Sequence, residues 1–201
     1  ANYIEKLLTG ESTGHDWWHI YRVWQTTKHI AKEENANTLV VELAALLHDI
    51  ADWKFHNGDD SVGPAKAREY MQSIGVENHI IEHVCQIISE ISFKGSGVSD
   101  KPSTLECKIV QDADRLDAMG AIGIARTFAY GGAKGRELYN PNINPQNHAS
   151  FEEYKKNNSP TINHFYEKLF LLKDRMHTNS AKNIAAERHA YMEQFVERFK
   201  K

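Results

Sequence analysis

Residues 39–51, LVVELAALLHDIA, are apolar on nearly all sides until the chain reaches His48 and Asp49. A helix that is hydrophobic all round is buried by its neighbours, so this segment predicts the central helix of a helical bundle. Burying an imidazole and a carboxylate side by side without a partner is costly. A metal ion removes that cost, because it accepts the lone pair of one group and balances the charge of the other.

Helical periodicity continues on both sides of this central segment. Apolar residues recur at helical spacing through 18–34, and β-branched residues form a single apolar stripe through 77–91. A further helix is predicted between Ser61 and Gly75, because Pro64 lies in its first turn and glycine is favoured just past a helix end. The pattern is therefore that of an all-α protein.

The second half of the chain is also predicted to be helical, apart from one long loop. Ser103 and Glu106 have the spacing of a capping box, which would open a helix that carries QDADRLDA. A Gly-Gly pair and several prolines predict an irregular segment over 131–149. Two uninterrupted helices are expected after it, from Pro160 to Met176 and over about 181–199.

Length and composition point to one folded domain. The chain has 201 residues, of which 41% are hydrophobic and 25% charged, which is ordinary usage for a globular protein. Since a typical domain has about 150 residues, we expect a single domain over residues 1–201. Its metal-site core is expected over about 15–130, and a helical C-terminal part over about 150–201.

Several classes of protein are not favoured by the sequence. A net charge of -3 gives no broad basic surface for duplex nucleic acid or an anionic membrane. The sequence has neither an apolar stretch long enough to span a membrane nor a leader-like N-terminus, although Ala1 is not an initiator methionine and a removed leader stays an alternative. Cys85 and Cys107 lack metal or disulfide spacing and favour a cytoplasmic location. The oligomeric state is not set by the sequence.

Two more residues complete a candidate metal site with His48 and Asp49. His19 lies in WWHIYRVW, and Asp114 lies in IVQDADRLDAMG. Two imidazoles and two carboxylates suit an octahedral first-row ion with open positions for water, rather than structural zinc. We therefore expect one divalent transition metal per chain, which would be Mn, Co, Ni or Fe.

The three segments that carry these residues resemble the HD-domain superfamily of metal-dependent phosphohydrolases. The resemblance runs through HDWWHIYRVW, ALLHDIADWKF and IVQDADRLDAMGAIGIARTF, and the C-terminal run is also similar. It is greatest with the small bacterial single-domain members, which include nucleotide pyrophosphohydrolases. The resemblance implies an all-helical fold and His19, His48, Asp49 and Asp114 as metal ligands.

Asp52 is the candidate general base. It lies four residues after His48, on the same helix face, so its carboxylate can reach a water molecule beside the metal. The alternative is a solvent-facing residue at the end of the helix. Hydrolases of ppGpp in this superfamily read HDxxED where this chain reads HDIADW, so Trp53 replaces an acid. This departure argues against the ppGpp reaction.

Phosphate groups need cations, and Arg22, Lys54 and Arg115 are the candidates for binding them. Arg22 lies three residues after His19, and the other two lie close to the predicted ligands along the chain. His83 follows a histidine at the spacing that can chelate a metal, so it is a candidate ligand for a second ion. Each of these residues has a solvent-exposed surface role as its alternative.

The function expected from these residues is hydrolysis of a small phosphate ester, most simply a (deoxy)nucleoside phosphate, by metal-activated water. The first alternative is a phosphodiesterase for a cyclic or alarmone nucleotide, which a second metal would favour. The other is a non-catalytic sensor that binds a metal or a nucleotide. The exact substrate and the number of phosphates removed depend on pocket shape, which the sequence does not show.

Overall fold

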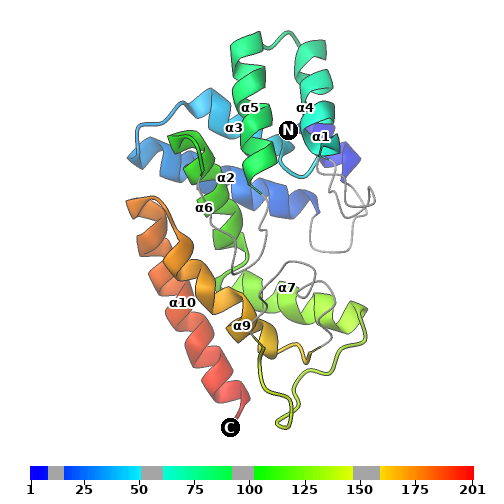
Figure 1. Cartoon of the computed structure of the whole chain (residues 1–201), viewed down its shortest axis with the longest axis vertical. Coiled ribbons are helices and arrows are strands. Elements are labelled where there is room, and N and C mark those ends of the chain that lie inside the picture. Colours follow the sequence, from blue (N-terminus) through cyan, green and yellow to red (C-terminus); the bar gives the residue numbers. More distant parts are fainter. Residues whose placement is uncertain (9–15, 51–60, 92–101, 147–158) are drawn as a thin grey trace. The chain divides into compact units, whose positions relative to one another are not determined.

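The structure is a computed structural model, and all the regular elements in its described part are helices (Figure 1). It describes residues 1–8, 16–50, 61–91, 102–146 and 159–201. The all-α prediction is therefore confirmed. The described residues form two compact units, the first within residues 1–113 and the second within 114–201. The prediction of a single domain over the whole chain stays a prediction.

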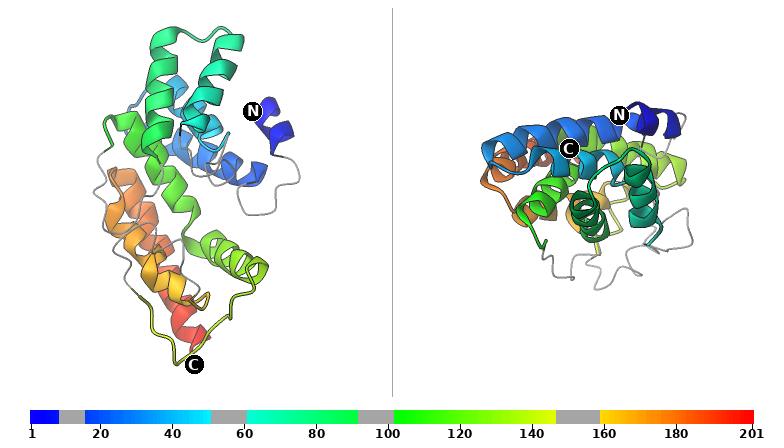
Figure 2. Two further views of the ribbon diagram at one scale, coloured as in Figure 1. Left: turned by 45° about the vertical axis from the view of Figure 1, so that its right-hand side comes forward. Right: turned by 90° about the horizontal axis from the view of Figure 1, so that it is seen from above.

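The first unit is arranged around helix α3. Its helices are α1 (Asn2–Leu7), α2 (Trp17–Glu33), α3 (Thr38–Leu47), α4 (Val62–Ser73), α5 (Asn78–Glu90) and the first part of α6 (Leu105–Asp117). Helix α3 packs against both α2 and α5, and α5 also packs against α4 (Figures 1 and 2). Val41, Ala44 and Leu47 of α3 are almost completely buried. The central position predicted for LVVELAALLHDIA is confirmed.

The capping box predicted at Ser103 and Glu106 is wrong. Thr104 caps α6 instead, since its Oγ1 accepts a hydrogen bond from the Cys107 N–H at 3.2 Å. The Ser103 N–H and hydroxyl both donate to the Glu90 carboxylate, at 2.9 and 2.8 Å. Burial raises the pKa of Glu90, but the hydrogen bonds from Ser103, together with those from Gln86 and Cys107, outweigh burial and leave its pKa below the usual value. The Ser103 hydroxyl, which the sequence predicted to cap α6, therefore donates its hydrogen bond to Glu90 at the end of α5.

The second unit contains the last turn of α6 and the helices that follow it. These are α7 (Gly120–Ala133), α9 (Asn163–Glu167), the 3-10 helix η2 (Leu169–Arg175) and α10 (Asn179–Phe199). Helix α10 packs against α7 and η2. Phe128, Phe165 and Phe195 form an aromatic core, with ring centroids 5.9–6.2 Å apart. Apolar packing of this kind is the main stabilising contribution to such a unit.

Two boundaries in the second unit differ from the predictions. Helix α7 runs through the Gly-Gly pair to Ala133, so the irregular segment begins at Lys134. Gly131 is needed for close packing, because a Cβ there would lie 2.2 Å from Thr161 Oγ1. The helix predicted from Pro160 to Met176 is interrupted at Lys168, where α9 ends and η2 begins. Residues 147–149 lie outside the described part of the chain.

Two findings bear on the expected location. In the described part of the chain, no helix is both long and apolar enough to cross a membrane. Cys85 and Cys107 are both buried and free. The cytoplasmic location stays a prediction.

Candidate metal centre

His19 lies in the first turn of α2 and is completely buried. The helix begins at Asp16, whose Oδ1 accepts a hydrogen bond from the His19 N–H at 2.9 Å. This N-cap fixes the first turn and therefore the direction in which the imidazole leaves the helix. Asp16 was not among the predicted site residues, although an aspartate directly before an amphipathic helix is a recognisable capping signal.

His48 and Asp49 lie immediately after the last residue of α3. His48 is buried, and its Nδ1 lies 2.8 Å from the carbonyl oxygen of Ala45. Since a carbonyl oxygen only accepts, Nδ1 donates this hydrogen bond, and Nε2 is the ring nitrogen that faces the other two side chains. Hydrogen bonding of one ring nitrogen in this way typically orients a metal-ligating histidine. No residue pattern could have shown the role of the Ala45 carbonyl.

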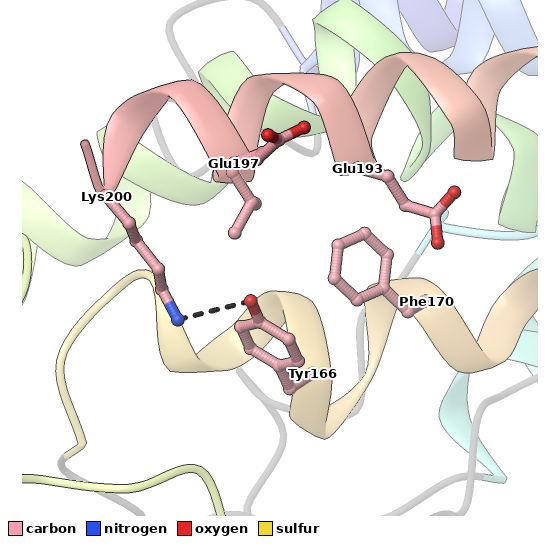
Figure 3. Close-up of a pocket in the computed structure, with 6 residues that line it drawn as sticks. Tyr166, Phe170, Glu193, Glu197 and Lys200 are labelled. Atoms are coloured by element: carbon pink, nitrogen blue, oxygen red, sulfur yellow. Dashed lines mark hydrogen bonds between the residues drawn. The ribbon is translucent and has the colours of Figure 1, made fainter.

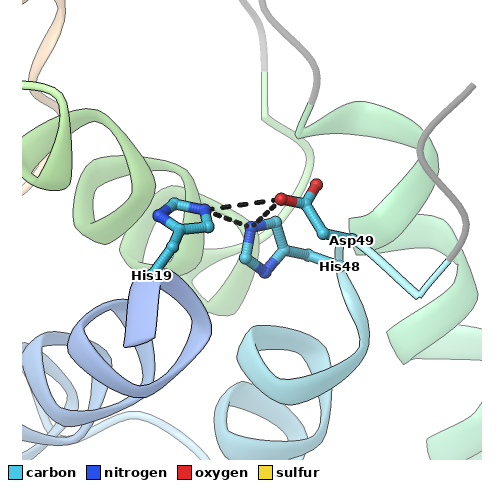
Figure 4. A group of neighbouring side chains, drawn as sticks. All are labelled: His19, His48 and Asp49. Atoms are coloured by element: carbon cyan, nitrogen blue, oxygen red, sulfur yellow. Dashed lines mark hydrogen bonds and ion pairs between the residues drawn. The ribbon is translucent and has the colours of Figure 1, made fainter. Parts of the chain in front are cut away.

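The three side chains meet in a compact triangle, which we call the histidine cluster (Figure 4). His19 Nε2 lies 3.3 Å from His48 Nε2, and Asp49 Oδ2 lies 3.4 Å from each of these nitrogens. Asp49 is the most exposed of the three, with 17% of its side chain accessible. The cluster therefore has a buried base made of two imidazoles and a more accessible edge made of a carboxylate.

The distances within the histidine cluster fit a single metal ion. Donors bound at about 2.1 Å to one ion lie about 3.0 Å apart in adjacent octahedral positions and about 3.4 Å apart in a tetrahedron. Two imidazole nitrogens and one carboxylate oxygen are a set that first-row divalent ions accept. The observed separations of 3.3–3.4 Å are closer to the tetrahedral value than to the octahedral one that the sequence favoured. The residues fit a divalent ion, and its identity and coordination geometry stay predictions.

Asp114, the fourth predicted ligand, lies in the last turn of α6 and is half-buried. It belongs to the second unit, whereas the histidine cluster belongs to the first. Asp112 is completely buried, and Asp117 accepts a hydrogen bond from Arg126 at 2.7 Å. The role of Asp114 as a ligand stays a prediction.

The predicted base and phosphate-binding residues are only partly described by the structure. Asp52 and Lys54 lie within 51–60, outside the described residues. Arg22 is half-buried on α2, the helix that carries His19. Arg115 is 5% exposed, and its Nη1 donates to the carbonyl oxygen of Arg175 at 2.6 Å. Their roles in phosphate binding stay predictions.

His83, the candidate ligand for a second ion, has protein partners. Its Nε2 lies 3.0 Å from Thr104 Oγ1 and 3.9 Å from the Glu106 carboxylate. Its neighbour in the predicted pair, His79, is largely exposed and lies 3.3 Å from Glu77. Among the described residues, the histidine cluster is the one group of three or more side chains that could hold a metal ion, and His83 is not part of it.

A hollow of about 480 Å³ lies in the second unit, between α10 and the segment of α9 and η2 (Figure 3). Its rim carries Tyr166 and Phe170 on one side and Glu193 and Glu197 on the other. The amino group of Lys200 donates to the Tyr166 hydroxyl at 3.2 Å. None of the predicted site residues lines this hollow, so it is not a candidate for the predicted chemistry.

The sequence profile of the HD domain family matches residues 17–119, just over half of the chain. The matched range contains His19, His48, Asp49 and Asp114. The chain belongs to the HD domain family. The resemblance noted in the sequence is therefore confirmed.

Relatives of this HD domain protein extend over nearly its whole length. A crystallised HD-superfamily hydrolase from Bacillus thuringiensis is 44% identical, with a TM-score of 0.77 over 100% of this chain and 92% of that chain. A Lactobacillus plantarum protein is 39% identical, with a TM-score of 0.84 over 99% and 92% of the two chains. The uncharacterized protein YpgQ of Bacillus subtilis is 39% identical over 99% of this chain and 89% of its own length.

YpgQ has also been crystallised in complex with ADP. That structure has a TM-score of 0.77 with this HD domain protein and covers 99% of this chain and 95% of the YpgQ chain. The fold predicted from the sequence is thus shared along almost the entire length of these relatives.

Proposed function

We propose that this chain is a metal-dependent phosphohydrolase that acts on nucleotides, with (deoxy)nucleoside phosphates as its substrates. The observation that carries the proposal is the convergence of His19, His48 and Asp49 on one point. Two further findings support it, since a relative is an HD-superfamily hydrolase and another was crystallised with ADP. The complex of YpgQ with ADP is the finding that supports a nucleotide as the phosphate ester.

The proposed cofactor is one divalent transition metal per chain, with Mn, Co, Ni or Fe favoured over structural zinc. His19, His48, Asp49 and Asp114 would hold it, which leaves positions for water and for a phosphate oxygen. When bound, the ion would supply Lewis acidity and bring the pKa of a water molecule toward neutrality. His48 is suited to this task, because its hydrogen bond to Ala45 keeps Nε2 available as a donor of electrons.

The remaining chemistry is assigned to protein side chains. Asp52, four residues after His48 in the sequence, would take the proton from the attacking water as the general base. Arg22 and Lys54 would bind the phosphate oxygens, since a guanidinium or ammonium group neutralises an oxyanion without ligating a cation. Arg115 stays in the proposed set, although its Nη1 also contacts the Arg175 carbonyl oxygen and His177 Nε2.

The proposal is tested by incubating purified protein and Mn²⁺ with a panel of nucleotides and resolving the products. Release of phosphate or pyrophosphate from nucleoside phosphates supports the proposal, provided that the Asp49→Ala variant is inactive. Ring opening of a cyclic nucleotide, or cleavage of an alarmone alone, would establish the phosphodiesterase alternative. Nucleotide binding by calorimetry with no turnover on any substrate would establish the sensor.

A further inference from the structure

The last turn of α6 is held by an unusual series of contacts within the second unit. The three residues that follow Asp114 are each fixed through an arginine. Arg115 itself donates to the Arg175 carbonyl, the carbonyl of residue 116 accepts from α10, and the carboxylate of residue 117 accepts from α7. The turn that carries the proposed fourth ligand is therefore tied to three separate segments.

The contact from α10 is made by Arg188. Its Nη1 donates to the carbonyl oxygen of Leu116, which is 72 residues away along the chain. The same carbonyl also accepts a hydrogen bond from the Met119 N–H at 3.0 Å, so Arg188 is its second donor. A cation near the last carbonyls of a helix also complements the helix dipole. Arg188 therefore stabilises the end of α6 by a backbone hydrogen bond and by its charge.

The turn between α6 and α7 is shaped to admit this arginine. Gly120 has a φ of +71°, and a Cβ added there would lie 3.1 Å from Cγ of Arg188. A side chain at this position would strain the backbone and push the arginine stem away. The glycine thus allows both the left-handed turn and the close passage of Arg188 over it.

We propose that Arg188 is a positioning residue for Asp114. By holding the Leu116 carbonyl, it fixes the rotation of the last turn of α6 and so the direction of the Asp114 carboxylate. Metal ligands must be held within about 0.5 Å and 10–20° of their bonding geometry, and a frayed helix end does not provide this. The inference rests on the proposed function, in which Asp114 is a metal ligand.

The test measures Mn²⁺ affinity, by electron paramagnetic resonance of free Mn²⁺, together with thermal unfolding in EDTA. Arg188→Ala should weaken Mn²⁺ binding about tenfold, the lower end of the effect of groups that orient metal ligands. Arg188→Lys should recover part of the loss, because an ammonium group can still donate one hydrogen bond. Gly120→Ala should weaken binding in the same direction by displacing the arginine.

Met192→Ala is the matched control, since Met192 is completely buried on the same helix and its side chain has no N–H donor. It should lower the unfolding temperature in EDTA at least as much as Arg188→Ala, and yet leave Mn²⁺ affinity within about twofold. Unchanged affinity in Arg188→Ala, or an equal loss in Met192→Ala, would overturn the positioning role.

Asp114→Ala separates a failure of this inference from a failure of its premise. Full Mn²⁺ affinity in Asp114→Ala would remove the premise, and the inference would fall with it. If Asp114→Ala loses the metal while Arg188→Ala, Arg188→Lys and Gly120→Ala all keep it, only the positioning role is wrong. If one of the three variants Arg188→Ala, Arg188→Lys and Gly120→Ala does not fold, the Mn²⁺ affinities of the other two decide, because each variant perturbs the contact of Arg188 in a different way.

Discussion

The histidine cluster and the end of α6 both bury polar groups, but they satisfy them in opposite ways. At the end of α6, donors meet acceptors, as Arg126 meets Asp117 and Arg188 meets the Leu116 carbonyl. In the histidine cluster, two imidazole nitrogens and a carboxylate oxygen face one another at 3.3–3.4 Å. The first region pairs its polar groups with one another, whereas the second is a group of side chains that could hold a metal ion.

The largest expected effect is that of Asp49→Ala, which should remove the metal and lower turnover by at least about 10³-fold. Stability in EDTA should change little, because 17% of the Asp49 side chain is exposed and partly exposed ion pairs contribute little to stability. Metal content, turnover and unfolding in EDTA are the measurements. His83→Ala is the control and should keep metal and turnover. A large loss of stability in EDTA would show that the histidine cluster, like the end of α6, stabilises the fold without a metal.

Asp52→Asn should keep the metal and lower kcat by about 10²-fold or more, because the amide preserves shape but cannot take a proton. Metal analysis and steady-state kinetics on the same sample test this. A native rate would require another base. Asp117 would be a poor replacement, since it is buried and its carboxylate is paired with Arg126.

Arg22→Met should weaken phosphate recognition and leave the histidine cluster intact. We expect about a tenfold loss of kcat/KM for a nucleoside triphosphate and a smaller loss for bis-p-nitrophenyl phosphate, because the interaction scales with substrate charge. Lys28→Met on the same helix is the control, since Lys28 is exposed and lies over the Trp24 ring. Equal losses on both substrates would show that Arg22 supports the fold or the metal instead.

Asp117→Asn should act on stability rather than on chemistry, which is the reverse of Asp49→Ala. We expect unfolding in EDTA to become easier by about 1 kcal/mol, less than for a fully buried pair, because 23% of the Arg126 side chain is exposed. Urea denaturation measures this. No change in stability would mean that the ion pair does not hold the end of α6.

The smallest effect on the metal centre is expected from a pH dependence of stability that arises in the second unit. Burial, followed by the charges of Lys168 and Arg136, lowers the pKa of His164 to about 3 from 6.5. Below pH 6.5 His164 is protonated in the unfolded chain but not in the folded one. The free energy of unfolding therefore falls as the pH is lowered from 6.5 to about 3. His164→Asn should flatten this slope in urea denaturation, equally with Mn²⁺ or EDTA. An unchanged slope would show that His164 titrates normally.

The helical order of the chain was predictable because periodicity records which face of each helix is buried. The pattern LVVELAALLHDIA correctly indicated a central helix, and the same pattern placed His48 and Asp49 at its end. Ser103 was misassigned because a hydroxyl can satisfy either a nearby backbone N–H or a distant carboxylate, and Glu90 lies on another helix. A capping pattern covers only neighbouring residues, so it cannot show that a carboxylate on another helix accepts the same hydroxyl.

The residues that orient the site were the least predictable. Arg188 lies more than 70 residues after Asp114 in sequence, and its contact with Gly120 depends on how α10 packs within the second unit. The Gly-Gly pair was predicted to begin a loop, but it is part of α7, where Gly131 makes room for Thr161. Sequence patterns predict candidate ligands, whereas the groups that would orient those ligands depend on tertiary packing.

The most direct test of the central claim is electron spin echo envelope modulation of the Mn²⁺-loaded protein, which detects nitrogen nuclei bound to the ion. With His19 and His48 as ligands, the spectrum should show coupling to two imidazole nitrogens, reduced to one in His48→Gln. The thermal shift on adding Mn²⁺ should decrease in the same variant, because fewer ligands stabilise the folded state. Mn²⁺ bound without any nitrogen coupling would contradict the account, since the ion would then lie away from the histidine cluster.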